Sequence, residues 1–110
     1  MSGYVYLITE LDSEKHYKIG VTKKADIEAR KKELQTGNSS ELHILTYFKT
    51  QYPYKLEKLL HQKYANKNKI NEWYELNEDE VLNFDKTCQQ YEEILDSLKD
   101  NPFFNKNSVV

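Results

Sequence analysis

The chain has 110 residues, enough for one domain, and 38% of them are hydrophobic whereas 31% are charged. Its one cysteine excludes an intramolecular disulfide, and the lack of a signal-peptide pattern or a membrane-length apolar run predicts a soluble intracellular protein with no membrane partner. Residues 1–73 carry 13 Lys and Arg against 9 Asp and Glu, so the overall net charge of −2 conceals a mildly basic body that is compatible with a phosphate-bearing partner.

Two short strands are predicted at the start of the chain, "YVYLI" at 4–8 and "HYKIGV" at 16–21. The polar stretch between them is typical of a hairpin loop. Side chains alternate across a strand, so one face of the hairpin is apolar and is assigned to the core. That face holds Val5, Leu7, Tyr17, Ile19 and Val21. The opposite face holds Tyr4, Tyr6, Ile8, Lys18 and Gly20.

This second face of the hairpin has two interpretations. Tyr6 and Lys18 share it with Gly20, whose missing side chain leaves room for a group to approach the backbone, as a small reactive surface needs. Tyrosine and lysine are also ordinary on the wet side of a hairpin, where they contact each other without any function. The alternation of side chains by itself favours the second interpretation.

A helix and a third strand are predicted next. Segment 22–38 has apolar and basic residues at helical spacing, and Gly37 is a natural end for the helix. The spaced positions are Ile27, Arg30 and Leu34. Residues 41–50 are rich in β-branched and aromatic side chains, which predicts a strand.

The second half of the chain is predicted to be mainly helical. Pro53 suits the first turn of a helix over 53–67, and 71–76 forms a short extended piece. Asn77 with Glu80 is typical of a capping box that opens a last helix over 78–100. The apolar stripe of this helix is Val81, Phe84, Cys88, Tyr91, Leu95 and Leu98.

This order of elements predicts an α+β fold with a small three-stranded antiparallel sheet flanked by helices. Residues 1–76 form the main body of the domain, and 77–100 form an extra C-terminal helix that packs on it. Residues 101–110 are expected to be a flexible tail.

Several of these segments form an ordered set of motifs, "YVYLI", "YKIG" with a following threonine, an arginine with "LQTGN", "LE" with "LH", and "EW". In this order and spacing they resemble the GIY-YIG nuclease superfamily, and in particular its small phage- and virus-type branch with a YKIG second motif. The resemblance covers about residues 4–76. It implies a GIY-YIG-like fold for 1–76 and, for a viral protein, a location in the cytoplasm or nucleus of the host cell.

The resemblance also implies a catalytic set. Tyr6 matches the tyrosine of the first tripeptide, and Gly20 matches the glycine of the second, where its part is structural. Lys18 stands in the place of the second tripeptide's tyrosine. Arg30 matches the arginine of the first helix, and Glu57 matches the single metal-binding glutamate. The superfamily's later asparagine has no clear counterpart here.

These residue types suit the hydrolysis of a phosphodiester, which needs an activated water, neutralised phosphate charge and help for the leaving oxygen. Glu57 suits a single Mg²⁺ or Mn²⁺, and Arg30 can form a fork onto phosphate oxygens. Tyr6 accepts a proton from water only if its pKa falls well below about 10, a shift that the ammonium of Lys18 would favour. Lys18, if itself neutral, is the alternative base.

Further candidates surround this set. His61 lies one helical turn after Glu57, where it either donates a proton or forms an ordinary surface pair. Asn71 is the nearest stand-in for the superfamily's asparagine. Four lysines either contact a nucleic-acid backbone without reading its sequence or are solvated helix positions. They are Lys23, Lys24, Lys31 and Lys58.

The leading interpretation is a metal-dependent endonuclease whose partner is DNA. A catalytically silent nucleic-acid-binding module is the first alternative. An interaction protein that uses its acidic last helix to bind a basic partner, or a homo-oligomer, is the second. Retention of Tyr6, Arg30 and Glu57 favours the nuclease, since a pure binder needs no lone carboxylate beside phosphate. The modest charge favours a binding module.

Overall fold

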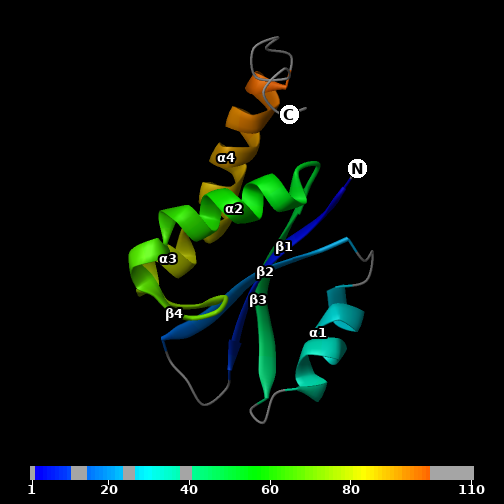
Figure 1. Cartoon of the computed structure of the whole chain (residues 1–110), viewed down its shortest axis with the longest axis vertical. Coiled ribbons are helices and arrows are strands. Elements are labelled where there is room, and N and C mark those ends of the chain that lie inside the picture. The colour runs from blue at the N-terminus through cyan, green and yellow to red at the C-terminus, as the bar shows by residue number, and fades with distance from the viewer. Residues whose placement is uncertain (1, 11–14, 24–26, 38–40, 100–110) are drawn as a thin grey trace.

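The computed structural model describes residues 2–10, 15–23, 27–37 and 41–99, and the predicted tail lies outside them. Within this part of the chain the fold is α+β, with one five-stranded sheet, four α-helices and a short 3₁₀ helix, η1 (Ala65–Lys67) (Figure 1). The strands are β1 (Gly3–Glu10), β2 (His16–Thr22), β3 (Leu42–Thr50), β4 (Asn68–Ile70) and β5 (Trp73–Glu75). The α-helices are α1 (Ile27–Thr36), α2 (Pro53–Lys63), α3 (Glu78–Leu82) and α4 (Phe84–Leu98). None of these helices combines the length and the apolar character that a membrane span requires.

The sheet is antiparallel throughout, in the order β3-β1-β2-β5-β4. The prediction of three strands was therefore wrong, although β5 lies inside the segment predicted to be extended. Each missed strand is three residues long, so at most two of its side chains share a face and no alternation can be read. All three residues of β4 are exposed, so this strand also lacks a buried apolar pattern.

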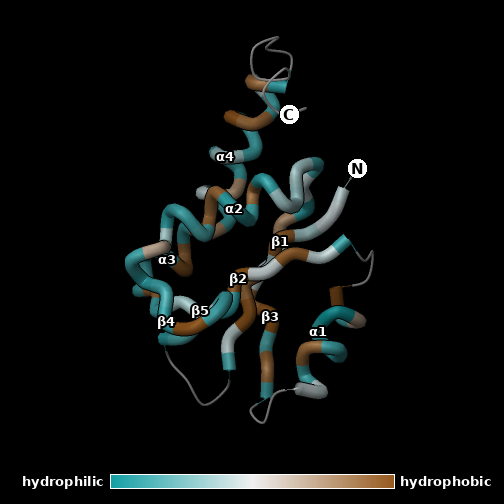
Figure 2. The backbone as a smooth tube through the Cα atoms, viewed as in Figure 1, coloured by the Kyte–Doolittle hydropathy of each residue, from teal (hydrophilic) through white to brown (hydrophobic). Residues whose placement is uncertain are grey.

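The main core lies between the sheet and the helices α2 and α4. Val5 and Leu7 of β1 and Ile19 of β2 are fully buried there, which confirms the face assigned to the core of the hairpin. Each such aliphatic side chain contributes about 1.5–3 kcal/mol to folding. Figure 2 shows hydrophobic stretches of the backbone gathered where β1, β2 and β3 run side by side. The helices add Leu56, Leu60, Phe84, Cys88 and Leu95.

The opposite face of the hairpin is also packed, so Tyr6 lies neither on an open reactive surface nor on the wet side of the hairpin. Helix α1 covers it and contributes Ile27 and Leu34 to a second, smaller core (Figure 1). Tyr6, Ile8 and Leu42 are buried at the centre of this core. The alternation rule sorted the side chains correctly, since Tyr6 lies opposite Gly20 and Ile8 opposite Lys18. It contains no information about which helix covers each face.

The predicted last helix is divided at Asn83 into α3 and α4. The capping box of Asn77 and Glu80 is present as predicted, with bonds of 2.9 Å and 2.8 Å. At Asn83 the side-chain amide donates to the carbonyl of Asp79 at 2.8 Å. An asparagine side chain that bonds a main-chain carbonyl four residues earlier competes with the regular hydrogen bonds of the helix, which accounts for the break.

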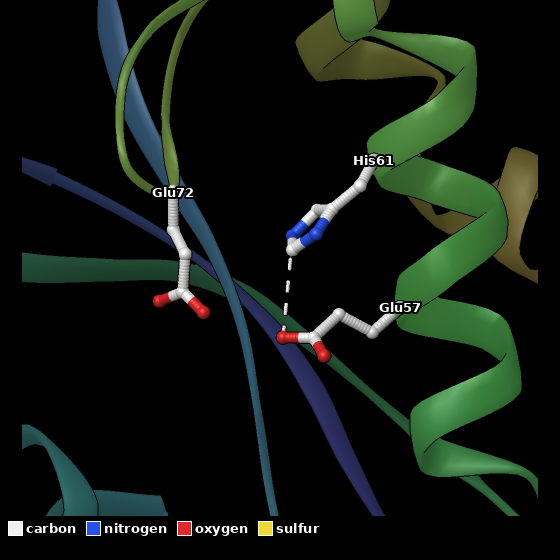
Figure 3. Close-up of side chains that lie close together, drawn as sticks. All are labelled: Glu57, His61 and Glu72. Carbon is white, nitrogen blue, oxygen red and sulfur yellow. Dashed lines mark ion pairs between the residues drawn. The ribbon is translucent and has the colours of Figure 1, made fainter.

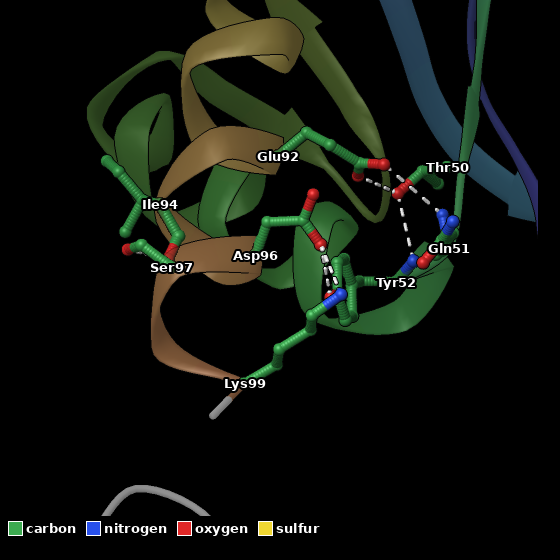
Figure 4. A network of polar contacts seen from close by, with 8 residues as sticks. All are labelled: Thr50, Gln51, Tyr52, Glu92, Ile94, Asp96, Ser97 and Lys99. Atoms are coloured by element: carbon green, nitrogen blue, oxygen red, sulfur yellow. Dashed lines mark hydrogen bonds and ion pairs between the residues drawn. The ribbon is translucent and has the colours of Figure 1, made fainter. Parts of the chain in front are cut away.

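Helix α4 runs from beneath α2 to beyond the body of the domain, toward the C-terminus (Figure 1). Side chains of its second half bind the turn between β3 and α2 (Figure 4). Thr50, which is buried, donates its hydroxyl to Glu92 and accepts the N–H of Tyr52 at 2.9 Å. The Tyr52 hydroxyl in turn donates to Asp96 at 2.6 Å. These bonds connect α4 to the same domain as the sheet.

Candidate active site

A cluster of two carboxylates and one imidazole lies beside strand β2. Glu57 and His61 come from α2, and Glu72 comes from the turn between β4 and β5 (Figure 3). One potential ligand atom of each side chain lies within 4.8 Å of the other two. All three side chains are partly buried, so they are preorganised and still reachable from solvent.

The imidazole of His61 is fixed by three neighbours. Its Nε2 lies 4.0 Å from Glu57 Oε2 and 3.2 Å from the carbonyl oxygen of Ile19, and its ring stacks on Tyr74 at 5.5 Å between centroids. A carbonyl only accepts hydrogen bonds, so Nε2 carries a proton in the bond to Ile19. The ring is thus held in a fixed orientation beside the two carboxylates.

Glu72 is held by the backbone of its turn. Asn71, just before it, has a positive φ of 54°, and the Asn68 side chain bonds the carbonyls on both sides of Glu72. The carbonyl of Glu72 accepts the N–H of Ile19 at 3.1 Å. Asn71 therefore serves as a turn residue, which asparagine suits because it tolerates the left-handed region. Asn71, the candidate for the superfamily's asparagine, therefore directly precedes Glu72, whose carboxylate joins the cluster.

Lys18 faces Glu72 from strand β2. Its Nζ lies 3.1 Å from Glu72 Oε2 and 5.7 Å from the centroid of the Trp73 ring. Trp73 itself packs against the second core. In this arrangement Lys18 is the counter-ion of Glu72.

Tyr6 lies beneath α1, with its side chain completely buried. Its ring crosses Gly20, where an added Cβ would collide with the Tyr6 hydroxyl. Gly20 is therefore required to accommodate the Tyr6 ring. The suggestion that it leaves room for an approaching ligand was wrong, because the ring already fills that space. Burial is the main cause that raises the pKa of Tyr6, with Glu72 and Glu57 adding to the effect and Arg30 opposing it. The shift is therefore opposite to the one that general-base catalysis by Tyr6 requires and that Lys18 was expected to favour.

Arg30 of α1 lies against the Tyr6 hydroxyl, close enough to affect its pKa. Among the residues that the structure describes, neither the Tyr6 hydroxyl nor Arg30 Nε has a hydrogen-bond partner of good geometry, although both atoms are buried. The two groups nevertheless interact, since Arg30 lowers the pKa of Tyr6 and Tyr6 raises that of Arg30.

Burial and neighbouring charges also shift the pKa of the Glu57 carboxyl. Its pKa is raised, first by burial and then by Glu72, while His61 and Lys18 act in the opposite direction. A carboxylate that is desolvated in this way gains more from a bound cation than an exposed one does. The donor set of Glu57, Glu72 and His61 fits a divalent ion, since carboxylate oxygens suit Mg²⁺ and the imidazole also suits first-row transition metals.

The structure thus brings together Lys18, Glu57 and His61 around Glu72, and it places Tyr6 and Arg30 in direct contact. Glu72 was not predicted as a site residue, although it stands in the "EW" motif. Its position depends on the turn between two strands that the sequence did not reveal. The sequence did contain one signal for Glu72: it is a carboxylate residue within the "EW" motif and directly follows Asn71.

The candidate nucleic-acid-binding lysines are dispersed. Lys23 directly follows β2, and its Nζ lies 5.1 Å from the centroid of the Tyr54 ring on α2. Lys58 is exposed on α2, whereas Lys31 is partly buried on α1. Lys24 lies outside the described residues. Lys58 thus belongs to the helix that carries Glu57, and Lys23 contacts that helix through Tyr54.

Comparison with known proteins gives one family. A search of the curated proteins and a search of the solved structures each produced no match. The model of the T5orf172 domain, a phage-associated domain related to nuclease-like folds, matches residues 3–89. This stretch runs from β1 into α4 and contains every residue of the cluster. The chain therefore belongs to the T5orf172 domain family.

Proposed function

We propose that the protein is a metal-dependent endonuclease that hydrolyses phosphodiester bonds in DNA, with chemistry of the GIY-YIG type. The main support for this proposal is that potential ligand atoms of Glu57, His61 and Glu72 lie within 4.8 Å of one another. Glu57 and Glu72 are also close enough to Tyr6 to raise its pKa. The relation of the T5orf172 domain to nuclease-like folds supports the same reaction class.

Glu57, Glu72 and His61 would hold one Mg²⁺ or Mn²⁺. Such an ion, when bound, makes its water more acidic and neutralises charge on the phosphate. The stacking of His61 on Tyr74 and its bond to Ile19 fix the direction of the imidazole without help from the ion.

Arg30 and Tyr6 would bind the phosphate and the attacking water. The guanidinium suits two phosphate oxygens, and the Arg30 Nε lacks a good partner among the described residues. Because its pKa is raised, Tyr6 stays protonated at neutral pH and donates its hydrogen rather than accepting one. The raised pKa therefore favours positioning of the water by Tyr6 over general-base catalysis.

Lys18 remains the candidate base. Its ammonium is the counter-ion of Glu72, at 3.1 Å, beside the proposed metal site. As a neutral amine, Lys18 would accept a proton from the attacking water in place of Tyr6.

The test is incubation with plasmid, single-stranded and branched DNA in Mg²⁺ or Mn²⁺, beside Glu57→Gln. The matched control is Glu75→Gln, which removes an exposed carboxylate from neighbouring β5. We expect cleavage by the wild type and Glu75→Gln but not by Glu57→Gln. Cleavage that survives in Glu57→Gln would contradict the assignment.

A catalytically silent nucleic-acid-binding module is the second candidate. The complete burial of the Tyr6 side chain favours it, because a catalytic hydroxyl must reach the substrate. Binding of DNA without cleavage of any substrate in either metal would establish this alternative.

A further inference from the structure

Tyr54 is a large aromatic side chain that faces solvent in the first turn of α2. It is 55% exposed, and it lies beside the ammonium of Lys23, which is 5.1 Å from the ring centroid. The pair thus combines an accessible aromatic ring with a cation. These are the two groups that a nucleotide needs, one for its base and one for its phosphate.

Helical geometry connects this pair to the active site. Tyr54, Glu57 and His61 stand at positions i, i+3 and i+7 of α2, so they follow one another along the same face of the helix. Three residues of helix rise by about 4.5 Å, which is comparable to the step of about 3.4 Å between stacked nucleotides. A strand with one phosphate at Glu57 therefore passes Tyr54 within a nucleotide or two.

We propose that Tyr54 and Lys23 form a binding site for single-stranded DNA that holds an unpaired nucleotide next to the scissile phosphodiester. The base stacks on the Tyr54 ring, and Lys23 neutralises a phosphate of the same strand. The inference rests on the proposed function for the reaction, but the binding step needs neither metal nor catalysis.

The aromatic ring decides between single strands and duplex. Bases inside a duplex are already stacked on both sides, so an exposed ring gains nothing from them, whereas every unpaired base offers a free face. A purely electrostatic site would need only lysines. The Tyr54–Lys23 pair is therefore better suited to a single strand, or to the unpaired part of a branched substrate.

The experiment measures fluorescence anisotropy of a short labelled single strand and of its duplex, in EDTA and at fixed salt. Tyr54→Ala should weaken binding of the single strand about 5- to 150-fold, as expected for loss of one stacked base. Tyr54→Phe keeps the ring and should bind as the wild type does. Lys23→Gln should weaken binding and reduce the salt slope by about 1.

Tyr47→Ala is the matched control, because Tyr47 is 52% exposed but lies on the edge strand β3 and not on α2. Its affinity should equal that of the wild type. Unchanged affinity of Tyr54→Ala, or an equal loss in Tyr47→Ala, would overturn the site. Duplex binding as tight as single-strand binding would overturn the substrate class.

Glu57→Gln separates this inference from the proposed function. In EDTA it should bind the single strand at least as tightly as the wild type does, because it loses a negative charge beside the strand, while its cleavage in Mn²⁺ is lost. If binding follows Tyr54 as described but Glu57→Gln still cleaves, the nuclease assignment fails and the binding site stands. If Glu57→Gln abolishes cleavage but Tyr54→Ala binds normally, only the binding site fails.

Discussion

The ring of Tyr6 occupies the space that a side chain at Gly20 would need. The two residues lie directly opposite each other on β1 and β2, so the tyrosine covers the backbone of its partner. An aromatic side chain that lies across a cross-strand glycine compensates for the contacts that glycine lacks. The glycine of the second motif is thereby explained by packing.

Gly20→Ala should destabilise the fold by about 1–3 kcal/mol, because the new methyl group displaces a buried ring. Urea unfolding measures the change. Gly37→Ala is the control, since no neighbouring atom of the described residues lies within 4 Å of the corresponding methyl group and Gly37 has no positive φ. Equal effects of the two substitutions would contradict the packing explanation.

Tyr6→Phe should reduce cleavage sharply and leave stability nearly unchanged. The hydroxyl that it removes has no good hydrogen-bond partner among the described residues, so the fold loses no bond. In combination with Gly20→Ala, Tyr6→Phe should also restore part of the lost stability, because the hydroxyl oxygen is one of the colliding atoms. Cleavage that is unaffected by Tyr6→Phe would remove the hydroxyl from the reaction.

Stability should depend on pH through Glu57. Its pKa is raised in the native state, so between the ordinary value of about 4.3 and the raised value the native chain holds a proton that the unfolded chain has released. The free energy of unfolding therefore falls as pH rises through this window. Glu57→Gln should lack this fall and be more stable than the wild type at neutral pH, as urea unfolding across the window would show. A variant that is less stable at neutral pH would contradict the desolvation argument.

Divalent metal should reverse that penalty. Addition of Mn²⁺ at about 100 times its dissociation constant should stabilise the wild type by about 2.7 kcal/mol, measured by thermal unfolding against EDTA. Glu57→Gln and Glu72→Gln should lose most of this gain, and Glu75→Gln should keep it. An undiminished gain in Glu72→Gln would show that Glu72 is only the counter-ion of Lys18.

Thr50→Val should weaken the connection between α4 and the sheet. The hydroxyl donates to Glu92 and accepts the Tyr52 N–H in a buried position, so its loss should cost about 1–3 kcal/mol in urea unfolding. Thr46→Val is the control on the same strand. The Thr46 hydroxyl bonds Asp85 where solvent can replace it, so this change should cost less than about 1 kcal/mol. Equal losses would show that burial of Thr50 is not what matters.

The sequence was sufficient for features that depend on neighbours along the chain. Alternation sorted both faces of the hairpin, and the capping box at Asn77 is present with both of its bonds. The helix over α2 was placed from Pro53, which fixed the relation between Glu57 and His61. Each of these depends on local geometry with a fixed period.

Features that depend on distant segments were missed or misjudged. The burial of Tyr6 is caused by α1, and the position of Glu72 is caused by the pairing of β4 with β5. The expectation for the pKa of Tyr6 failed for the same reason. A phenol beside Lys18 was expected to ionise more easily, but desolvation by the covering helix outweighs any neighbouring cation.

The contacts at Ile19 have a consequence for assembly. Beyond Lys18, β2 is no longer paired with β5, and a main-chain edge of this kind can recruit a foreign strand. Here the N–H of Ile19 is bonded to the Glu72 carbonyl and its own carbonyl to His61. The groups proposed for catalysis therefore also satisfy this edge of the sheet, so that loss of His61 would expose an aggregation-prone strand edge as well as impair the proposed cleavage.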